Sequence, residues 1–516
     1  MLLSDIMPRI RACGAHLHFL SESGALSSHT FAELHDDVRT LAAALQQLGV
    51  IAGMRLGILG PSSYRWLVWD LAISSCGAIS VAFAHEKSAQ PLEDTLTRLS
   101  VCLVAASPEL LSPEELRRPE VVDIDVGTYP DKRVIARWPH HDPDPRTHSL
   151  AFSSGTTGKT KGLLISRPGT EHLLNLYEAA FGSEKGDRFL TFLPFANYQQ
   201  RMLYYFCLYH GVDFVYVPYQ SLFQALKRFQ PTCVIAPPVF YEAARSMSEA
   251  GVPIQAGNDL RRERLSARLK ELLGGNIRYL ITGMAPIKRQ TLDFFWNHDV
   301  ALYEAFGITE AGMVCWNKPG QIKLGSVGRP AEPGSVSLSA DGEVIVTREA
   351  LLSLGYFESS EEDARTTFLG SNSVATGDIA RMDGDGFLTI IGRKKDAIIV
   401  RSGEKFHPEA IEGQIQDDPQ VKAAVVMGGE PLPGVVALVV VRDKGDGSVI
   451  ERIHERIARI NASLPQFQRV RQVLFTEGEF TVENGMRTGN LKLNRRAILK
   501  RFETDLMSAG AAHVGH

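Results

Sequence analysis

Residues 151–162 combine the residue types that proteins use to bind phosphate. The stretch reads Ala-Phe-Ser-Ser-Gly-Thr-Thr-Gly-Lys-Thr-Lys-Gly and lies between two apolar runs, residues 149–152 and 163–165. Glycine permits the turns that let backbone N–H groups converge on an anion. Hydroxyl groups add hydrogen-bond donors, and lysine adds positive charge. We therefore predict a phosphate-gripping loop between two strands.

Two other interpretations of this loop are a P-loop and a surface hairpin. Gly158-Lys159-Thr160 resembles the end of a Walker A motif, which requires a glycine four intervening residues before its Gly-Lys pair. Ser153 occupies that position, and an apolar strand follows where the motif has a helix, so a P-loop NTPase is excluded. A Ser/Thr/Gly surface hairpin remains an alternative for the stretch taken alone.

The loop resembles the signature of the adenylate-forming superfamily, which includes acyl-CoA synthetases, peptide-synthetase adenylation domains and firefly-type luciferases. Its usual pattern is Ser/Thr-Ser/Gly-Gly-Thr-Thr-Gly-x-Pro-Lys-Gly, and here Thr160 stands where proline is usual. The resemblance implies that ATP phosphates are bound by Ser153, Ser154, Gly155, Thr156, Thr157, Gly158 and Lys161.

A second motif, residues 302–310, reads Leu-Tyr-Glu-Ala-Phe-Gly-Ile-Thr-Glu and resembles the family's Tyr/Phe-Gly-x-Thr-Glu. The resemblance implies that Phe306, followed by Gly307, stacks on adenine, that Thr309 contacts the phosphates and that Glu310 holds Mg²⁺. A carboxylate is a hard oxygen ligand for Mg²⁺, and the metal offsets charge as pyrophosphate departs. The alternative is that Glu310 is an ordinary carboxylate at the start of a helix.

Further motifs follow in the family's order. Thr376-Gly-Asp378 resembles the ribose-binding motif, in which one carboxylate accepts hydrogen bonds from both ribose hydroxyls. By the same resemblance Arg393 reaches the ribose or phosphate, and Lys395 is the hinge about which a C-terminal domain rotates between half-reactions. A weaker match places Gly283, Met284 and Ala285 against adenine.

Residues 481–496 resemble the closing motif of long-chain acyl-CoA synthetases, which places the adenylation lysine at Lys492. A lysine is needed because negative charge builds on the carboxylate oxygen and the α-phosphate. Asn490 and Asn494 depart from the usual threonine and lysine, and an ordinary surface lysine is the alternative. Residues 402–408 resemble the run that lines the pantetheine tunnel, with Ser402 and Gly403 at its start.

The sequence specifies the carboxylic acid substrate less precisely than it specifies the nucleotide site. Residues 193–201, Leu-Pro-Phe-Ala-Asn-Tyr-Gln-Gln-Arg, are most similar to long-chain acyl-CoA synthetases. Candidates for the acyl pocket are Phe195, Asn197, Tyr198, Met284 and Gly312. The aromatic residues could equally belong to the core, and Tyr198 could close a short pocket for an aryl acid.

Alternating strands and helices are predicted to position these motifs. A capping box at Thr30 and Glu33 starts a helix that Gly49 ends, and strand 55–59, helix 61–77 and strand 77–83 follow. After the loop, strands are predicted at 188–193, 214–217, 232–235 and 277–281, with helices at 170–181, 199–210, 221–229 and 260–273. Such patterns form parallel sheets that bind ligands at the carboxyl ends of their strands. Residues 107–148 are interpreted as an irregular connection.

The fold expected from this resemblance is α/β. A large N-terminal adenylate-forming domain, residues 1–392, has two α/β sheet subdomains plus a small β-barrel subdomain near 322–391. A small mobile α+β C-terminal domain, residues 393–516, carries Lys492. Its predicted elements are helices at 408–416, 448–463 and 494–507 and strands at 421–428 and 435–441.

Composition sets the cellular context. The chain has 516 residues, 44% apolar and 22% charged, with a net charge of −4, which implies neither nucleic-acid nor membrane electrostatics. Its 6 cysteines form no CxxC pair and indicate a reduced, cytoplasmic protein. We expect no signal peptide and no membrane span.

Together the motifs predict an AMP-forming acid–thiol ligase that uses ATP, Mg²⁺ and coenzyme A, most simply a fatty or other hydrophobic acyl-CoA synthetase. Alternatives are a ligase that loads the phosphopantetheine of an acyl carrier protein, an enzyme for an aryl or unusual acid, and a degenerate homologue that only binds nucleotide.

Overall fold

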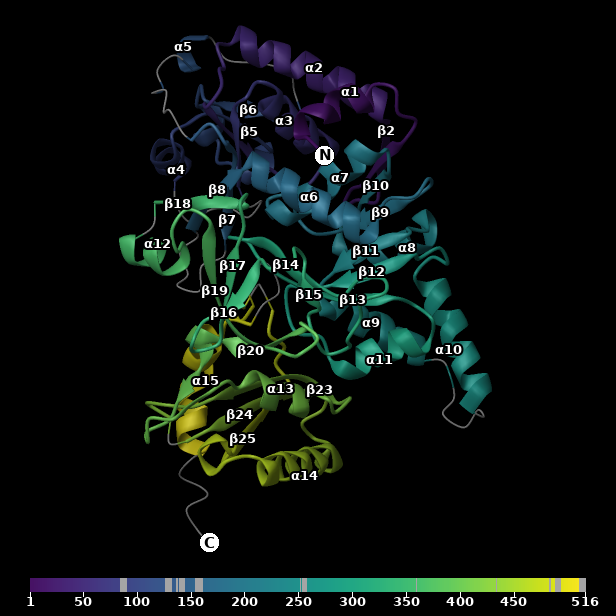
Figure 1. Cartoon of the computed structure of the whole chain (residues 1–516), viewed down its shortest axis with the longest axis vertical. Helices are drawn as coiled ribbons and strands as arrows, with labels where there is room; N and C mark the ends of the chain where they lie inside the picture. Colours follow the sequence, from purple (N-terminus) through teal and green to yellow (C-terminus); the bar gives the residue numbers. More distant parts are fainter. Residues whose placement is uncertain are drawn as a thin grey trace.

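The structure is a computed structural model. It describes residues 1–83, 91–125, 132–135, 138, 144–153, 161–250, 252, 258–358, 360–432, 434–481, 484–487 and 493–509. Figure 1 shows a large upper part built from two sheets with their helices, and a smaller lower part that contains the last 120 or so residues.

A seven-stranded sheet carries both strands of the predicted phosphate loop. Its order is β18-β8-β7-β4-β3-β5-β6. The strands are β3 (Arg55–Leu59), β4 (Ile79–Ala82), β5 (Val101–Ala106), β6 (Val121–Asp123), β7 (Thr147–Ser153), β8 (Lys161–Ser166) and β18 (Ser353–Phe357). β3 to β7 pair in parallel, whereas β8 is antiparallel to both β7 and β18. The predicted strand–helix–strand order is confirmed.

One part of this sheet was not predicted. β6 lies within residues 107–148, which we interpreted as an irregular connection, and it pairs in parallel with β5. That interpretation was wrong for β6 and also for the short helix α5 (Lys132–Ile135), because elements this short do not show a sequence period.

A nine-stranded sheet forms the second half of the large part. Its order is β15-β14-β13-β12-β11-β9-β10-β1-β2. The strands are β1 (His16–Leu20), β2 (Leu26–Thr30), β9 (Arg188–Thr191), β10 (Asp213–Tyr216), β11 (Cys233–Ala236), β12 (Tyr279–Thr282), β13 (Leu302–Ile308), β14 (Gly312–Trp316) and β15 (Arg329–Pro330). The N-terminal hairpin β1–β2 joins this sheet through parallel pairing of β1 with β10.

Helices cover the two sheets and pack between them (Figure 1). α2 begins with the predicted capping box, in which the Thr30 side chain accepts from Glu33 N–H and Glu33 accepts from Thr30 N–H. The helices are α1 (Ile6–Ile10), α2 (Phe31–Gln47), α3 (Tyr64–Ser75), α4 (Leu92–Leu99), α5 (Lys132–Ile135), α6 (Arg167–Phe181), α7 (Tyr198–His210), α8 (Leu222–Phe229), α9 (Pro238–Glu249), α10 (Asn258–Leu272) and α11 (Arg289–Asn297).

A buried ion pair joins the core helices to the sheet below the phosphate loop. Arg201 on α7 donates to Asp70 on α3 over 2.9 Å, and both side chains are at most 1% exposed. The same guanidinium donates to Ser80 on β4 over 2.9 Å and to Ser149 on β7 over 2.6 Å. The hydroxyls of Tyr204 and Tyr205 also donate to Asp70, so hydrogen bonds tie the pair to α3, α7, β4 and β7.

The small subdomain expected near 322–391 is a four-stranded antiparallel sheet in the order β16-β17-β19-β20. Its strands are β16 (Val336–Leu338), β17 (Glu343–Thr347), β19 (Ser373–Met382) and β20 (Leu388–Arg393). β18 and the following α12 (Glu361–Thr367) depart from it, and β18 extends the seven-stranded sheet instead.

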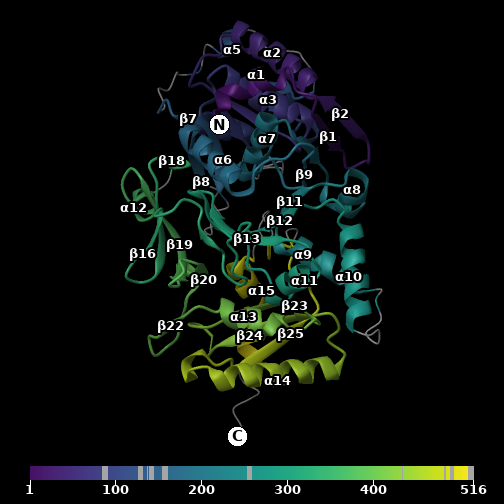
Figure 2. The ribbon, with the colours of Figure 1, turned by 45° about the vertical axis from the view of Figure 1, so that its right-hand side comes forward.

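The C-terminal part is α+β, as predicted. The antiparallel strands β23 (Val421–Met427) and β24 (Val436–Val441) are joined in parallel by β25 (Gln472–Thr476), which we did not predict. The remaining elements are β21 (Ile398–Ile399), β22 (Lys405–Phe406), α13 (Glu409–Gln416), α14 (Gly447–Ser463) and α15 (Arg495–Ala509). Two apolar clusters drawn only from residues 398–506 form its core. Figure 2 shows this sheet between α14 below and α11 above.

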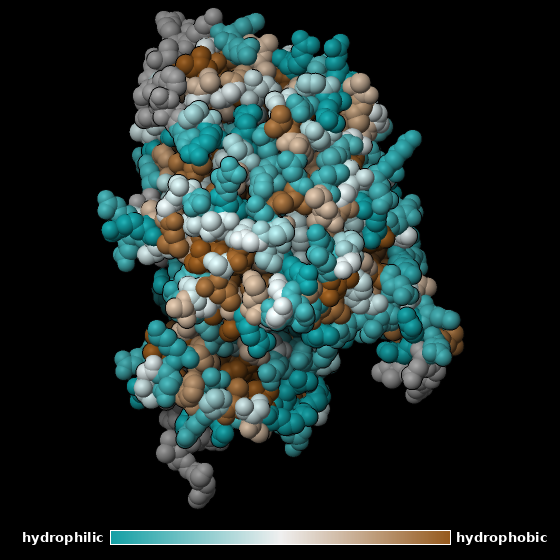
Figure 3. All heavy atoms as spheres, viewed as in Figure 1, coloured by the Kyte–Doolittle hydropathy of each residue, from teal (hydrophilic) through white to brown (hydrophobic). Residues whose placement is uncertain are grey.

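Hydrophilic side chains cover most of the face seen in Figure 3. They include the side chains of the arginine-rich α10, at the right of the view. Among the described residues, every helix lacks the combination of length and hydrophobicity that a membrane crossing would require.

Candidate functional site

Two segments predicted to contact adenine lie side by side at the carboxyl ends of neighbouring parallel strands. Residues 283–285 follow β12, and Phe306 lies near the end of β13. A Cβ placed on Gly283 would come 3.0 Å from the carbonyl oxygen of Ala305, so the two backbones are in close contact there. Met284 has a φ of 72°, an uncommon value for a residue with a side chain. This is the edge at which open α/β sheets bind ligands.

The predicted metal-binding carboxylate lies in a tight turn and not at the start of a helix. Thr309, Glu310 and Ala311 connect the antiparallel strands β13 and β14. The turn requires glycine at its base, because a Cβ on Gly307 would meet the carbonyl oxygen of Gly312 at 2.5 Å. The interpretation of Glu310 as an ordinary helix-start residue is therefore wrong.

Three separate parts of the chain meet at Tyr356. The Tyr356 hydroxyl on β18 donates to Glu310 Oε1 over 3.0 Å. The ammonium group of Lys161, at the start of β8, lies 5.0 Å from the centre of the Tyr356 ring. The end of the phosphate loop and the predicted metal-binding carboxylate thus contact the same side chain.

Lys161 has a second partner on α12. Its ammonium group lies 2.8 Å from Asp363 Oδ2. That hydrogen bond, together with the nearby charge of Lys395, lowers the pKa of the Asp363 carboxyl. The predicted hinge lysine is therefore electrostatically coupled to the residues around the phosphate loop.

The predicted ribose carboxylate is buried beside its predicted arginine. Asp378 on β19 is 4% exposed, and its backbone is paired with that of Arg393 at the end of β20. Arg393 Nε donates to Asp378 Oδ1 over 3.0 Å. The Asp378 N–H donates to the hydroxyl of Thr376 over 3.1 Å, which fixes the Thr-Gly-Asp turn.

Charged groups crowd the predicted hinge. Lys395 lies in a single helical turn, Lys394–Asp396, and the Lys394 ammonium group is 2.7 Å from both Asp341 and Glu343 of the small sheet. Glu409 of α13 lies close to Gly392. A Cβ added to Gly392 would come 2.4 Å from a carboxylate oxygen of Glu409. Burial raises the pKa of Glu409 to about 7.

Part of the predicted site lies outside the described residues. This applies to Ser154, Gly155, Thr156, Thr157 and Gly158 of the loop, to the side chain of Ser153, and to Lys492. Ser402 and Gly403 are described and lie on the exposed turn between β21 and β22, where Gly403 has a φ of 92°.

Three of the acyl-pocket candidates, Phe195, Tyr198 and Gly312, are buried, whereas Asn197 and Met284 are half-buried. Phe195 is fully buried and packs edge-on against Trp66 and Tyr204. Asn197 caps α7 by accepting from Gln199 N–H. The Tyr198 hydroxyl is hydrogen-bonded to His148 and Thr170, each over 2.7 Å. Gly312 abuts Leu173 of α6, since a Cβ there would come 2.3 Å from Leu173 Cδ1. These contacts give the residues structural roles, and their part in binding an acyl chain stays a prediction.

Sequence reasoning missed Tyr356 and Asp363, which hold Lys161 and Glu310. Tyr356 follows Gly355 in a short strand, an ordinary pattern that carries no chemical signal of its own. Only the pairing of β18 with β8 reveals its position. Within the ranges that the structure describes, no three His, Cys, Asp or Glu side chains gather as a metal site.

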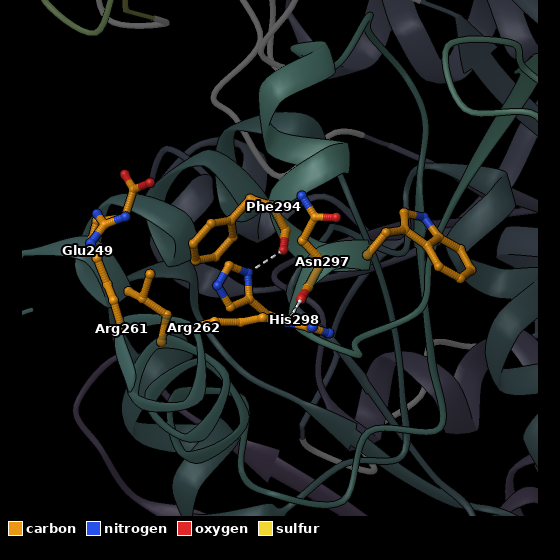
Figure 4. Close-up of a pocket in the computed structure, with 8 residues that line it drawn as sticks. Glu249, Arg261, Arg262, Phe294, Asn297 and His298 are labelled. Atoms are coloured by element: carbon orange, nitrogen blue, oxygen red, sulfur yellow. Dashed lines mark hydrogen bonds between the residues drawn. The ribbon is translucent and has the colours of Figure 1, made fainter. Parts of the chain in front are cut away.

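A separate hollow lies between α9, α10 and α11, away from these residues (Figure 4). Two of its polar groups are already paired: Arg262 Nε donates to the carbonyl oxygen of Asn297 over 2.9 Å, and His298 Nδ1 is 2.6 Å from the carbonyl oxygen of Phe294. None of the predicted site residues lines it.

The sequence matches two family models. Residues 14–346 match the AMP-binding enzyme model, and residues 395–511 match the AMP-binding enzyme C-terminal domain. One curated relative, the long-chain-fatty-acid–CoA ligase FadD15 of Mycobacterium bovis, is 26% identical over 558 residues, covering 94% of this chain and 92% of the relative.

Solved structures share the fold. The anthranilate CoA ligase AuaEII, in complex with anthranoyl-AMP, aligns with a TM-score of 0.78 at 22% identity, over 99% of this chain and 98% of that one. The o-succinylbenzoate CoA synthetase MenE of Bacillus subtilis aligns with a TM-score of 0.73 at 18% identity, over 96% of this chain and 97% of that one. Because the AMP-binding model alone spans well over half of the sequence, the chain belongs to the AMP-binding enzyme family.

Proposed function

We propose that this chain is an AMP-forming acyl-CoA synthetase that activates a fatty or other hydrophobic carboxylic acid. The observation that carries this proposal is the meeting of Lys161, Glu310 and Tyr356 beside the adenine-side segments at the ends of β12 and β13. The proposal is supported by family membership and by the similarity to a long-chain-fatty-acid–CoA ligase along nearly the whole chain.

In the first half-reaction the carboxylate of the acid attacks the α-phosphate of ATP, which forms acyl-AMP and releases pyrophosphate. Lys161 and the loop before it would bind the phosphates, and Phe306 would stack on adenine. Asp378, held by Arg393, would accept hydrogen bonds from the ribose hydroxyls. Lys492 would stabilise the negative charge that builds on the reacting oxygens.

Glu310 suits a magnesium ion, because it is a hard oxygen ligand that a hydrogen bond from Tyr356 holds in one orientation. When bound, the ion would offset the charge of the departing pyrophosphate.

In the second half-reaction the thiol of coenzyme A attacks the acyl carbonyl, forms the thioester and releases AMP. The C-terminal part would rotate about Lys395 to replace Lys492 with the turn that carries Ser402 and Gly403. A lysine in a single helical turn between two folded parts is a suitable pivot, because few backbone angles need to change there.

An aryl acid is the second candidate substrate. The buried rings of Phe195 and Tyr198 fill the region in which we predicted the acyl pocket, and this would leave room for a short, flat acid. A solved structure with the same fold is titled as an anthranilate CoA ligase. The phosphopantetheine of an acyl carrier protein is the alternative thiol acceptor to coenzyme A.

ATP–pyrophosphate exchange tests the proposal. Wild type, Lys492→Ala and the control Lys500→Ala, an exposed lysine on α15, receive dodecanoic, benzoic and acetic acids singly. We expect exchange with dodecanoic acid, lost in Lys492→Ala and kept in Lys500→Ala. Exchange with benzoic acid alone would select the aryl alternative. No exchange with any acid would refute the proposal for these classes.

A further inference from the structure

The turn that carries Glu310 is held from outside by one arginine. Arg348 directly follows β17 in the chain, and its side chain is fully buried. Its Nη1 donates to the carbonyl oxygen of Ala311, the residue after Glu310, over 2.9 Å. Its Nη2 donates to the carbonyl oxygen of Met313 on β14 over 2.6 Å. One guanidinium therefore binds the backbone on the side where the chain leaves Glu310.

A glutamate anchors this arginine from behind. Arg348 Nε lies 3.3 Å from Oε2 of Glu332, which is in the loop between β15 and β16. His172 Nε2 on α6 donates to the same oxygen over 2.9 Å. Burial lowers the pKa of Arg348, and the charge of Glu332 opposes this effect. Glu332 is thus the counter-ion of the buried guanidinium and ties it to α6.

Residues 348–356, which we name the clamp segment, contact the turn at both ends. Arg348 binds the backbone of the turn, and the Tyr356 hydroxyl donates to the Glu310 carboxylate over 3.0 Å. Because one contact is made to the backbone and the other to the carboxylate, together they fix the path of the turn and the orientation of its acidic group.

The middle of the clamp segment packs against the strand and helix that follow the phosphate loop. The N–H of Ser166, at the end of β8, donates to the carbonyl oxygen of Leu352 over 2.7 Å. A Cβ placed on Gly169 of α6 would come 2.0 Å from the carbonyl oxygen of Leu351, so the two backbones touch. The same piece of chain therefore holds the predicted metal-binding turn and the elements after the phosphate loop.

We propose that Arg348, anchored by Glu332, is a positioning residue that holds the turn so that Glu310 presents its carboxylate to Mg²⁺. The inference rests on the proposed function, in which Glu310 binds the ion during adenylation. Because two carbonyl oxygens occupy the Nη donors of Arg348, this residue acts through the placement of Glu310. Its loss should weaken the use of Mg²⁺ in the first half-reaction and spare the second, which releases no pyrophosphate.

The two half-reactions are measured separately on the full chain at a series of Mg²⁺ concentrations. ATP–pyrophosphate exchange with dodecanoic acid reports the first, and formation of dodecanoyl-CoA from synthetic dodecanoyl-AMP and coenzyme A reports the second. The ammonium group of Arg348→Lys cannot span both carbonyl oxygens, so the Mg²⁺ concentration for half-maximal exchange should rise about tenfold. Saturating Mg²⁺ should restore much of the exchange rate, and thioester formation should stay within about twofold of wild type.

Arg278→Lys is the matched control, because Arg278 holds the same kinds of group at the opposite, amino end of β12. It donates to the carbonyl oxygens of Phe181 and Gly182 over 3.0 Å and 3.1 Å and forms an ion pair with Asp187. We expect Arg278→Lys to keep the wild-type Mg²⁺ dependence. An unchanged Mg²⁺ dependence in Arg348→Lys, or an equal fall in both half-reactions, would overturn the proposal.

Glu332→Gln is a milder variant, which serves if Arg348→Lys folds poorly. Its amide oxygen still accepts hydrogen bonds, but the guanidinium loses its counter-ion, so half-maximal exchange should need about threefold more Mg²⁺. The control Glu178→Gln removes another pair made by α6, in which His210 Nε2 lies 3.3 Å from the carboxylate, and should behave as wild type. Wild-type Mg²⁺ dependence in Glu332→Gln would refute the anchoring role of Glu332.

Hydrogen exchange separates a failure of this proposal from a failure of the proposed function. The peptide covering residues 305–316 should exchange about fivefold faster in Arg348→Lys than in wild type, and at the wild-type rate in Arg278→Lys. This readout needs neither Mg²⁺ nor substrate, so it still decides on the contact if the wild type activates none of the acids. Unchanged hydrogen exchange of this peptide in Arg348→Lys would show that Arg348 does not position the turn.

Discussion

The interior around Asp70 and Arg201 and the boundary between α11 and the C-terminal part use polar side chains in opposite ways. There, Asp70 and Arg201 are excluded from water, and hydrogen bonds that involve Tyr204, Tyr205, Ser80 and Ser149 tie them to α3, α7, β4 and β7. At the boundary, the half-buried Lys288 and the exposed Gln290 each donate to one backbone carbonyl oxygen of the C-terminal part, over 3.5 Å and 3.1 Å.

The difference shows what each region must do. A fully buried ion pair is costly to break, because each partner would be left as an uncompensated charge in the interior. It therefore holds β4 and β7 in one arrangement. A partly exposed contact such as that of Gln290 loses less when it breaks, because water replaces the partner. The rigid region can position the phosphate loop, and the looser one can release the C-terminal part.

The largest effect is expected from breaking the buried pair. Asp70→Asn should lower the free energy of unfolding by about 3 to 5 kcal/mol, because Arg201 would keep its charge without its counter-ion. Urea unfolding followed by fluorescence measures this. Asp293→Asn is the surface control, since its pair with Arg289 is exposed and should contribute about 1 kcal/mol or less. Equal losses in the two variants would show that burial does not distinguish the regions.

A tenfold effect on activity is expected at Tyr356. Tyr356→Phe removes the hydrogen bond to Glu310 and leaves the ring beside Lys161, so the ATP–pyrophosphate exchange rate should fall about tenfold with little change in unfolding. Tyr209→Phe, which removes a hydrogen bond from Arg9 on another face, should leave the rate unchanged. If Tyr356→Phe kept the wild-type exchange rate, the hydrogen bond from Tyr356 to Glu310 would have no role in positioning the site.

The smallest effect, on pH dependence, is expected at the hinge. Burial raises the pKa of Glu409 to about 7, despite the charge of Arg495 and an N–H donated by Arg393. His407 also lies against Gly392, and Glu412 adds negative charge nearby. The folded protein therefore holds a proton that the unfolded chain releases at lower pH. Its stabilisation is complete below the ordinary glutamate pKa and is lost as pH rises towards 7.

We expect the free energy of unfolding of the wild type to fall by about 1 to 2 kcal/mol between pH 4.5 and pH 7, and Glu409→Gln to remove this fall. This value is smaller than the pKa shift alone would give, because the side chain is partly exposed. Thermal unfolding of both proteins at several pH values measures the difference. Glu451→Gln, an exposed glutamate on α14, should leave the pH profile as in the wild type. A wild-type profile without this fall would refute the role of Glu409.

Several parts of the fold could be predicted from the sequence because their signals are local. The capping box at Thr30 and Glu33 and the apolar runs that became β23 and β24 need only neighbouring residues to be recognised. β6 and β25 escaped prediction, since one has three residues and the other is evenly half-buried and shows no alternation. Their strand geometry comes from pairing with β5 and β24.

The sequence by itself determined which chemical groups are available: the carboxylates of Glu310 and Asp378, the lysines, and the order of the motifs along the chain. Only the tertiary structure decided which of them meet. β18 lies about 190 residues from β8 in the chain, and no local pattern announces that Tyr356 contacts both Lys161 and Glu310. The chemical groups are set by the identity of each residue. Which groups come close together depends on sheet pairing and burial, and these are set by long-range packing.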